Sequence, residues 1–196
     1  MDSASLRELG WFVIVTLVVN VIIIGLLLVT ADQGSGNHAC AVILTAPILL
    51  FVTLRYLRLL RTFVDVELGA ERSAWHIYIC EKLSIASAIL SIGCVIPGIQ
   101  LVAMPLQLLS LVAIVIFSLM SSIRLSDSVV EDIRIQIYQA SNVTSCVLML
   151  TIFLASIGVA LAIFAQIYLA VWAFRLSTER ELAASTAATM RMPWDD

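Results

Sequence analysis

Few side chains in this sequence are of the types that do chemistry, and none stands at a spacing that a known reaction needs. His38 and His76 lie far apart, and neither has a second His or Cys at metal-ligand spacing. The four cysteines are scattered and contain no C-x-x-C pair. Hydrolase, phosphate-loop and zinc-protease motifs are missing as well. We therefore expect a protein that is not an enzyme and that holds no metal or cofactor.

Three amide side chains interrupt otherwise apolar stretches: Asn20, Gln107 and Gln166. An amide inside a membrane either bonds to a neighbouring helix, worth about 1 kcal/mol, or lines a polar path. Interhelical bonding is the commoner use. No Asp, Glu, Lys or Arg lies at the expected mid-membrane depth, so the usual residues of a proton relay or an ion-coupled transporter are missing.

Two rows of small residues recur at helical spacing, with alternating steps of three and four residues. The first row is Ser84, Ser87, Ser91, Cys94 and Gly98, and the second is Thr151, Ala155, Gly158, Ala162 and Ala165. Such spacing puts each row on one helix face, where small side chains let membrane helices approach closely. We predict that both rows are helix-packing interfaces, either with each other or with a partner subunit.

The elements that carry these residues are apolar helices. The chain has 196 residues, of which 61% are hydrophobic and 13% charged, and its mean hydropathy is +1.05. Residues 11–30 contain no charge, and about 20 such residues are needed to cross a hydrocarbon core about 30 Å thick. Composition and length together indicate a multi-pass helical membrane protein.

We predict an all-α transmembrane bundle that forms a single integral membrane domain over residues 1–196. Residues 83–123 are uncharged but too long for one crossing, and Pro97-Gly98 marks the turn between two helices. The alternative is four spans, with residues 83–97 lying on the membrane surface. The five predicted spans are 11–30, 39–60, 79–96, 104–121 and 143–174, followed by a polar C-terminal tail over 175–196.

A short interfacial helix is predicted before the last span, over residues 123–142. Ser128 and Glu131 match a capping box there. Apolar residues then recur at helical spacing among polar ones, which is typical of a helix at the headgroup surface.

The positive charges predict the orientation of the bundle. Arg55, Arg58 and Arg61 directly follow the second predicted span, and we interpret them as topology anchors. Five spans place eight Lys and Arg on the side of the N-terminus and three on the side of the tail. The positive-inside rule then puts the N-terminus in the cytoplasm and the tail on the opposite face, whereas four spans would return the tail to the cytoplasm.

The expected partners are the lipid bilayer and other membrane subunits or further copies of the chain. The dispersed Lys and Arg exclude nucleic acid as a partner. The function we expect is that of a non-enzymatic membrane scaffold or accessory subunit. The alternatives are a small oligomeric channel or transporter, lined by Ser84, Ser87, Ser91 and the amides, and a membrane-shaping hairpin protein.

Overall fold

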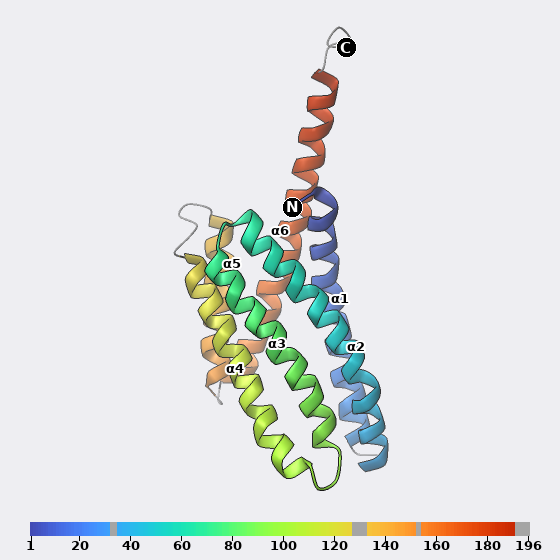
Figure 1. The fold of residues 1–196 in the computed structure, drawn as a ribbon. Coiled ribbons are helices and arrows are strands. Elements are labelled where there is room, and N and C mark those ends of the chain that lie inside the picture. Colours follow the sequence, from blue (N-terminus) through green and yellow to red (C-terminus); the bar gives the residue numbers. More distant parts are fainter. Residues whose placement is uncertain (32–34, 127–132, 152–153, 191–196) are drawn as a thin grey trace.

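The computed structural model describes residues 1–31, 35–126, 133–151 and 154–190. Almost all of these residues are helical, and no strand occurs among them. A π-helical turn, Phe63–Glu67, continues the second helix. The α-helices within the described ranges are α1 (Ser3–Ala31), α2 (Ser35–Thr62), α3 (Glu71–Cys94), α4 (Gln100–Ser126), α5 (Ile133–Leu150) and α6 (Ala155–Met190) (Figure 1).

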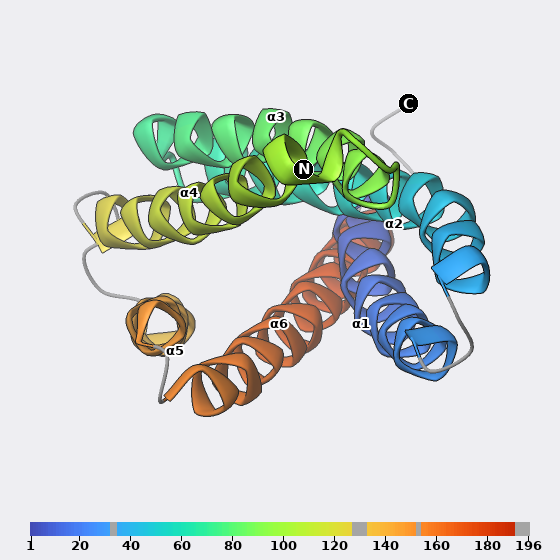
Figure 2. The ribbon, with the colours of Figure 1, turned by 90° about the horizontal axis from the view of Figure 1, so that it is seen from below.

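The helices form a ring in chain order. Each helix packs against the one that follows it, and α6 closes the ring by packing against α1. Figure 2 shows this arrangement from below. Successive helices run in opposite directions, so the start of α1 and the end of α6 lie at the same end of the bundle (Figure 1). We call this the terminal end, and the other the opposite end.

The predicted all-α, multi-pass helical fold is confirmed, and five of the described helices are long and apolar enough to span a membrane. The helices long and apolar enough to cross a membrane are Ser3–Ala31, Gly36–Glu67, Glu71–Cys94, Gln100–Leu125 and Ala155–Ala187. Several of them run beyond the predicted spans, because arginine side chains near a helix end can extend their charged groups to the headgroups while the helix continues.

The turn predicted at Pro97-Gly98 is present between α3 and α4. Gly98 has a φ of +87°, a backbone conformation that glycine adopts without steric cost. The amide of Gln100 donates to the carbonyl oxygen of Ile96 at 3.2 Å as α4 begins. The long uncharged stretch is therefore a helical hairpin, and the alternative with four spans and a surface segment does not hold.

The last predicted span, 143–174, differs from the structure, which divides it between α5 and α6. Helix α5 ends at Leu150, where both the amide and the hydroxyl of Thr151 donate to the carbonyl oxygen of Leu148, at 3.1 and 2.8 Å. A threonine hydroxyl that bonds a nearby carbonyl competes with the helical ladder. One polar residue in an apolar stretch is a weak signal, so composition alone suggested a single long span.

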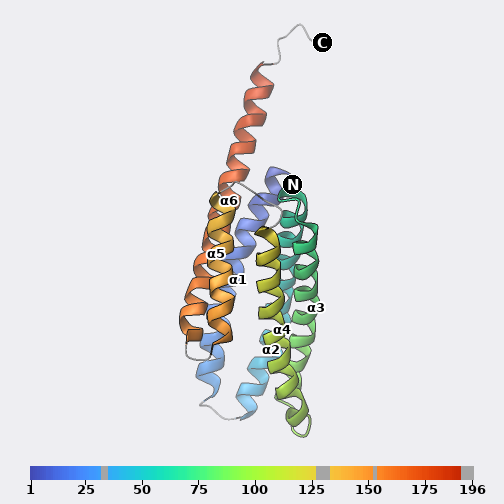
Figure 3. The same ribbon diagram turned by 90° about the vertical axis from the view of Figure 1, so that its left-hand side faces the viewer.

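The predicted interfacial helix over 123–142 also differs from the structure. Its first residues belong to α4, and residues 133–142 belong to α5, which stands upright beside α6 (Figure 3). The capping-box residues Ser128 and Glu131 lie outside the described residues. Asn142 and Ser145 of α5 donate to Ser122 of α4 and Gly158 of α6, so part of its polar face is used inside the bundle.

The N-terminus and the tail were expected on opposite faces, but they lie together at the terminal end. The N-terminal amine of Met1 and the guanidinium of Arg180 both pair with the carboxylate of Glu67. Arg7 bonds Glu181 at 2.7 Å, and the Ser177 hydroxyl donates to a backbone carbonyl near the start of α1. The upright α5 adds one more traverse of the bundle, which returns the chain to its starting face.

The tightest apolar core lies in the half of the ring nearest the terminal end. Leu6 and Leu9 of α1 and Leu169 of α6 are fully buried. Phe63 packs edge-on against Trp172, with ring centroids 5.2 Å apart. This cluster holds α1, α6 and the end of α2 together at the terminal end.

Candidate functional site

A cavity of about 200 Å³ lies inside the ring, between α2, α3, α4, α5 and α6. More than half of its lining residues carry a hydroxyl or an amide, and none of the lining residues is charged. The hydroxyl and amide residues are Thr53, Tyr56, Ser73, Ser84, Ser118, Ser121, Ser122, Tyr138, Asn142 and Gln166. Five helices therefore direct uncharged polar groups to one place inside an apolar bundle.

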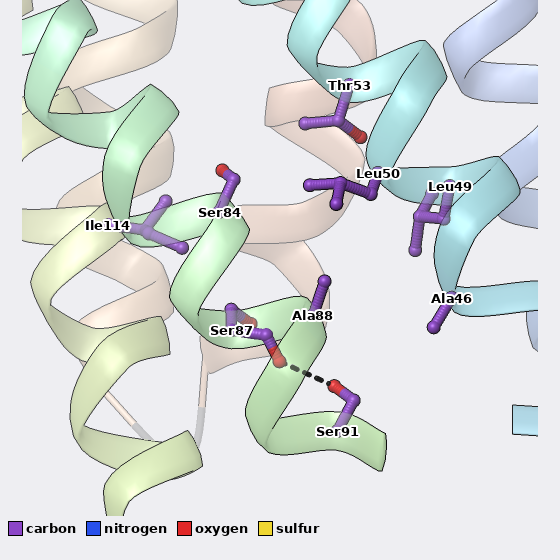
Figure 4. Close-up of a pocket in the computed structure, with 9 residues that line it drawn as sticks. All are labelled: Ala46, Leu49, Leu50, Thr53, Ser84, Ser87, Ala88, Ser91 and Ile114. Carbon is purple, nitrogen blue, oxygen red and sulfur yellow. Dashed lines mark hydrogen bonds between the residues drawn. The ribbon is translucent and has the colours of Figure 1, made fainter. Parts of the chain in front are cut away.

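A second space of about 170 Å³ adjoins the cavity on the side of the opposite end. The two share Thr53, Ser84 and Ile114, and Figure 4 shows Ser84, Ser87 and Ser91 of α3 facing Thr53 and Leu50 of α2. Together they follow α2 and α3 for about 27 Å at 1.5 Å per residue. We call the two spaces together the path; their lining residues extend over nearly the thickness of a hydrocarbon core, which is about 30 Å.

Along the wall of the cavity, α3 and α4 are joined by a row of polar contacts, which we call the polar seam. The hydroxyls of Ser73 and Ser121 lie 2.7 Å apart, and each also donates to the other residue's carbonyl oxygen. One heptad further on, the thiol of Cys80 donates to the carbonyl oxygen of Ile114 at 3.7 Å. Regular seven-residue steps of this kind are the geometry of an antiparallel coiled pair.

The seam continues to Gln107, one heptad beyond Ile114. Its amide nitrogen donates to the hydroxyls of Ser87 and Ser91, both at 3.0 Å, while its carbonyl oxygen is buried without a hydrogen bond. Ser84 donates to its own helix, at the carbonyl oxygen of Cys80, and its side chain borders both spaces. The serine row of α3 thus serves both the contact with α4 and the wall of the path.

Three polar side chains at the cavity lack a partner. Tyr56 of α2 and Tyr138 of α5 are each only 8% exposed and line the cavity, and the two phenols are near enough to interact electrostatically. Neither phenol makes a hydrogen bond within the described part of the chain, and the same is true of the amide of Gln166. The geometry is that of a site completed by water or by a ligand.

The remaining residues of the first predicted row lie at the end of α3. Cys94 is the last residue of the helix, and Gly98 lies in the turn that follows. The sequence singled out this face but did not specify its contact. The structure places the row against α4, and it does not bring it to the second row.

The second predicted row faces α5. The hydroxyl of Ser145 donates to the carbonyl oxygen of Gly158 at 2.9 Å. Thr151 lies in the turn before α6, whereas Ala155, Ala162 and Ala165 are on the helix itself. Ala165 is buried and also borders the cavity.

The arginines predicted as topology anchors all pair with carboxylates. Arg55 donates to Glu8 of α1 at 2.9 Å. Arg58 donates to Glu81 of α3 at 2.8 Å, and Arg61 lies 3.6 Å from the same carboxylate, which is only 5% exposed. These pairs tie the end of α2 to both of its neighbours. These partners are twenty or more residues apart in the sequence, so their pairing was not visible in it.

All described Lys and Arg lie in the half of the bundle nearest the terminal end. The described stretches 17–31, 35–54, 83–118, 141–151 and 154–174, which include the described residues of the opposite half, contain no Lys, Arg, Asp or Glu. The basic residues are Arg7, Arg55, Arg58, Arg61, Arg72, Lys82, Arg124, Arg134, Arg175 and Arg180.

The fold and the cavity define the class: a multi-pass helical membrane protein with an uncharged polar cavity inside its ring of helices. The chain matches no known protein family, and no characterised protein or solved structure is significantly similar to it. Among the described residues, no group of three His, Cys, Asp or Glu is placed to hold a metal ion.

Proposed function

We propose that the protein binds a small, uncharged, hydrogen-bonding solute in its ring cavity and lets it cross the membrane. The observation that carries this proposal is that Tyr56, Tyr138 and Gln166 line one space inside the ring and bond to no other side chain among the described residues. Two phenols and an amide can each donate and accept hydrogen bonds. They suit a solute such as a polyol or an amide.

The lining argues against a charged solute. Moving an ion into a membrane interior costs several kcal/mol unless an opposite charge meets it, and no charged residue lines the cavity. The length of the hydroxyl-lined path supports passage rather than storage alone. This proposal is closest to the channel or transporter alternative, but the cavity lies within a single chain and needs no oligomer.

We also propose that the terminal end faces the cytoplasm. The positive-inside rule applies to Lys and Arg in short loops and near span ends, and all of the described ones are in that half. Both the N-terminus and the end of α6 would then be cytoplasmic.

Solute entry into liposomes tests the transport proposal. Purified protein reconstituted into liposomes should speed the uptake of glycerol or urea over empty liposomes, measured by light scattering. Gln166→Leu should lower the rate several-fold, because it removes a polar partner from the cavity. Gln136→Leu is the matched control, since Gln136 is an exposed residue of α5 away from the cavity. Uptake equal to that of empty liposomes for both solutes would contradict the proposal.

A scaffold or accessory subunit is the second candidate, and the length of α6 favours it. The helix extends well past the rest of the bundle at the terminal end (Figures 1 and 3). Leu182 and the alanines around it are exposed on this extension. Truncation after Glu181 should release a co-purifying subunit if the extension holds one. The membrane-shaping alternative was based on the 83–121 hairpin and on an amphipathic surface segment over 123–142; the hairpin is present, whereas α5 packs along α6.

A further inference from the structure

An open pocket of about 320 Å³ lies at the terminal end, on the hairpin of α3 and α4. It is lined by Arg72, Trp75 and His76 of α3 and by Arg124 of α4. It shares no lining residue with the ring cavity or with the adjoining space, so it is a separate feature.

The hairpin holds these side chains in a fixed arrangement. The paired hydroxyls of Ser73 and Ser121 join the first turn of α3 to the last turns of α4, which brings Arg72 beside the turn of Arg124. His76 Nδ1 lies 2.7 Å from the carbonyl oxygen of Arg72, and the His76 ring packs edge-on against Trp75 at 5.3 Å. His76 is buried, whereas 57% of Trp75 is exposed.

The chemistry of the pocket suits a phosphate group. A guanidinium is a planar fork of N–H donors that matches the oxygens of a phosphate, and arginines from two helices line this pocket. Arg72 is the second residue of α3, and Arg124 stands two residues before the end of α4, so both lie at the level where a span meets water. Tryptophan is enriched at that level because its ring is partly polar and partly apolar.

We propose that this pocket binds the headgroup of an anionic phospholipid, with Arg72 and Arg124 on the phosphate and Trp75 beside the glycerol. A bilayer presents phosphate at this level next to apolar chains, which a free phosphate ion does not offer to an exposed indole. A zwitterionic headgroup brings its own cation against the two guanidiniums, so an anionic lipid fits better.

Lipid retention measured by native mass spectrometry tests the site. The full-length protein is mixed with equal amounts of phosphatidylglycerol and phosphatidylcholine before detergent activation. The wild type should retain phosphatidylglycerol several-fold more than phosphatidylcholine. Arg72→Gln combined with Arg124→Gln should bring the ratio close to one, and Trp75→Leu should lower retention of both lipids.

Controls separate this site from general attraction to basic residues. Arg55→Gln removes a positive charge at the same end, where Arg55 is paired with Glu8, and should keep the wild-type ratio. Arg72→Lys combined with Arg124→Lys keeps both charges and should give an intermediate ratio if the double glutamine variant fails to fold. Three results would each overturn the proposal: no phosphatidylglycerol preference in the wild type, an unchanged ratio in both double variants, or displacement of the lipid by millimolar inorganic phosphate.

Discussion

Ser145 of α5 and Gly158 of α6 meet where the two helices pack, with the serine hydroxyl 2.9 Å from the glycine carbonyl oxygen. A Cβ atom at position 158 would lie 2.8 Å from the backbone nitrogen of Met149 and 3.0 Å from the carbonyl oxygen of Ser145. Both of these are backbone atoms, which cannot move aside as a flexible side chain can. The upright position of α5 therefore depends on the absence of a side chain at Gly158.

Replacing this glycine should separate the two helices. Gly158→Leu should destabilise the protein by about 1–3 kcal/mol, the usual cost of overpacking, and should lower its melting temperature in detergent. Gly25→Leu is the control, because a Cβ at Gly25 of α1 would meet no atom within 4 Å. Equal melting temperatures for the two variants would show that α5 does not depend on this contact.

Removing only the serine partners of Gln107 should cost more stability than removing the serines and Gln107 together. Ser87→Ala combined with Ser91→Ala leaves the buried amide without acceptors, which should cost about 1–3 kcal/mol. Adding Gln107→Leu to that variant should recover much of the lost stability. The leucine removes the amide nitrogen that has lost its acceptors and the side-chain carbonyl oxygen that has no hydrogen bond. Thermal unfolding in one detergent measures all three proteins. A triple variant less stable than the double variant would contradict this account.

The spans could be predicted because length and apolar composition decide them. The division between α5 and α6 could not, because Thr151 is no stronger a signal than the other polar residues of this stretch and residues 135–174 contain no charge. The sequence did identify Gln166 and the serine row as polar groups inside apolar helices. Their use depends on which helix faces meet in the ring, and hydrophobic patterning does not determine that.

Nothing in the sequence indicated that Tyr56 and Tyr138 line a cavity. Tyr56 stands among the arginines that follow the second predicted span, a place typical of headgroup contact. Tyr138 belongs to the segment that we predicted to lie on the membrane surface. Both face the inside of the ring only because α2 continues past its basic residues and α5 stands upright.

Cys80 provides a native reporter of the ring cavity. Both Cys80 and Cys146 are buried, but Cys80 lines the cavity and Cys146 does not. With Cys40, Cys94 and Cys146 replaced by serine, we expect a small hydrophilic methanethiosulfonate to modify Cys80 in the folded protein. The matched protein with Cys146 as its sole cysteine should react much more slowly. Mass spectrometry of the intact chain measures both rates, and a slower reaction at Cys80 than at Cys146 would show that water does not reach the cavity.

Chemical labelling in cells tests the position of the two termini. Single cysteines at Ala4, Ser185 and Asn37 would be introduced into a chain without native cysteine, since all three positions are exposed. Ala4 and Ser185 lie toward the terminal end and Asn37 lies at the opposite end, so an impermeant maleimide applied to intact cells should label Asn37→Cys alone. Permeabilised cells should show labelling at all three. Labelling of Ser185→Cys without Ala4→Cys in intact cells would mean that α5 does not cross and that the chain has an odd number of traverses.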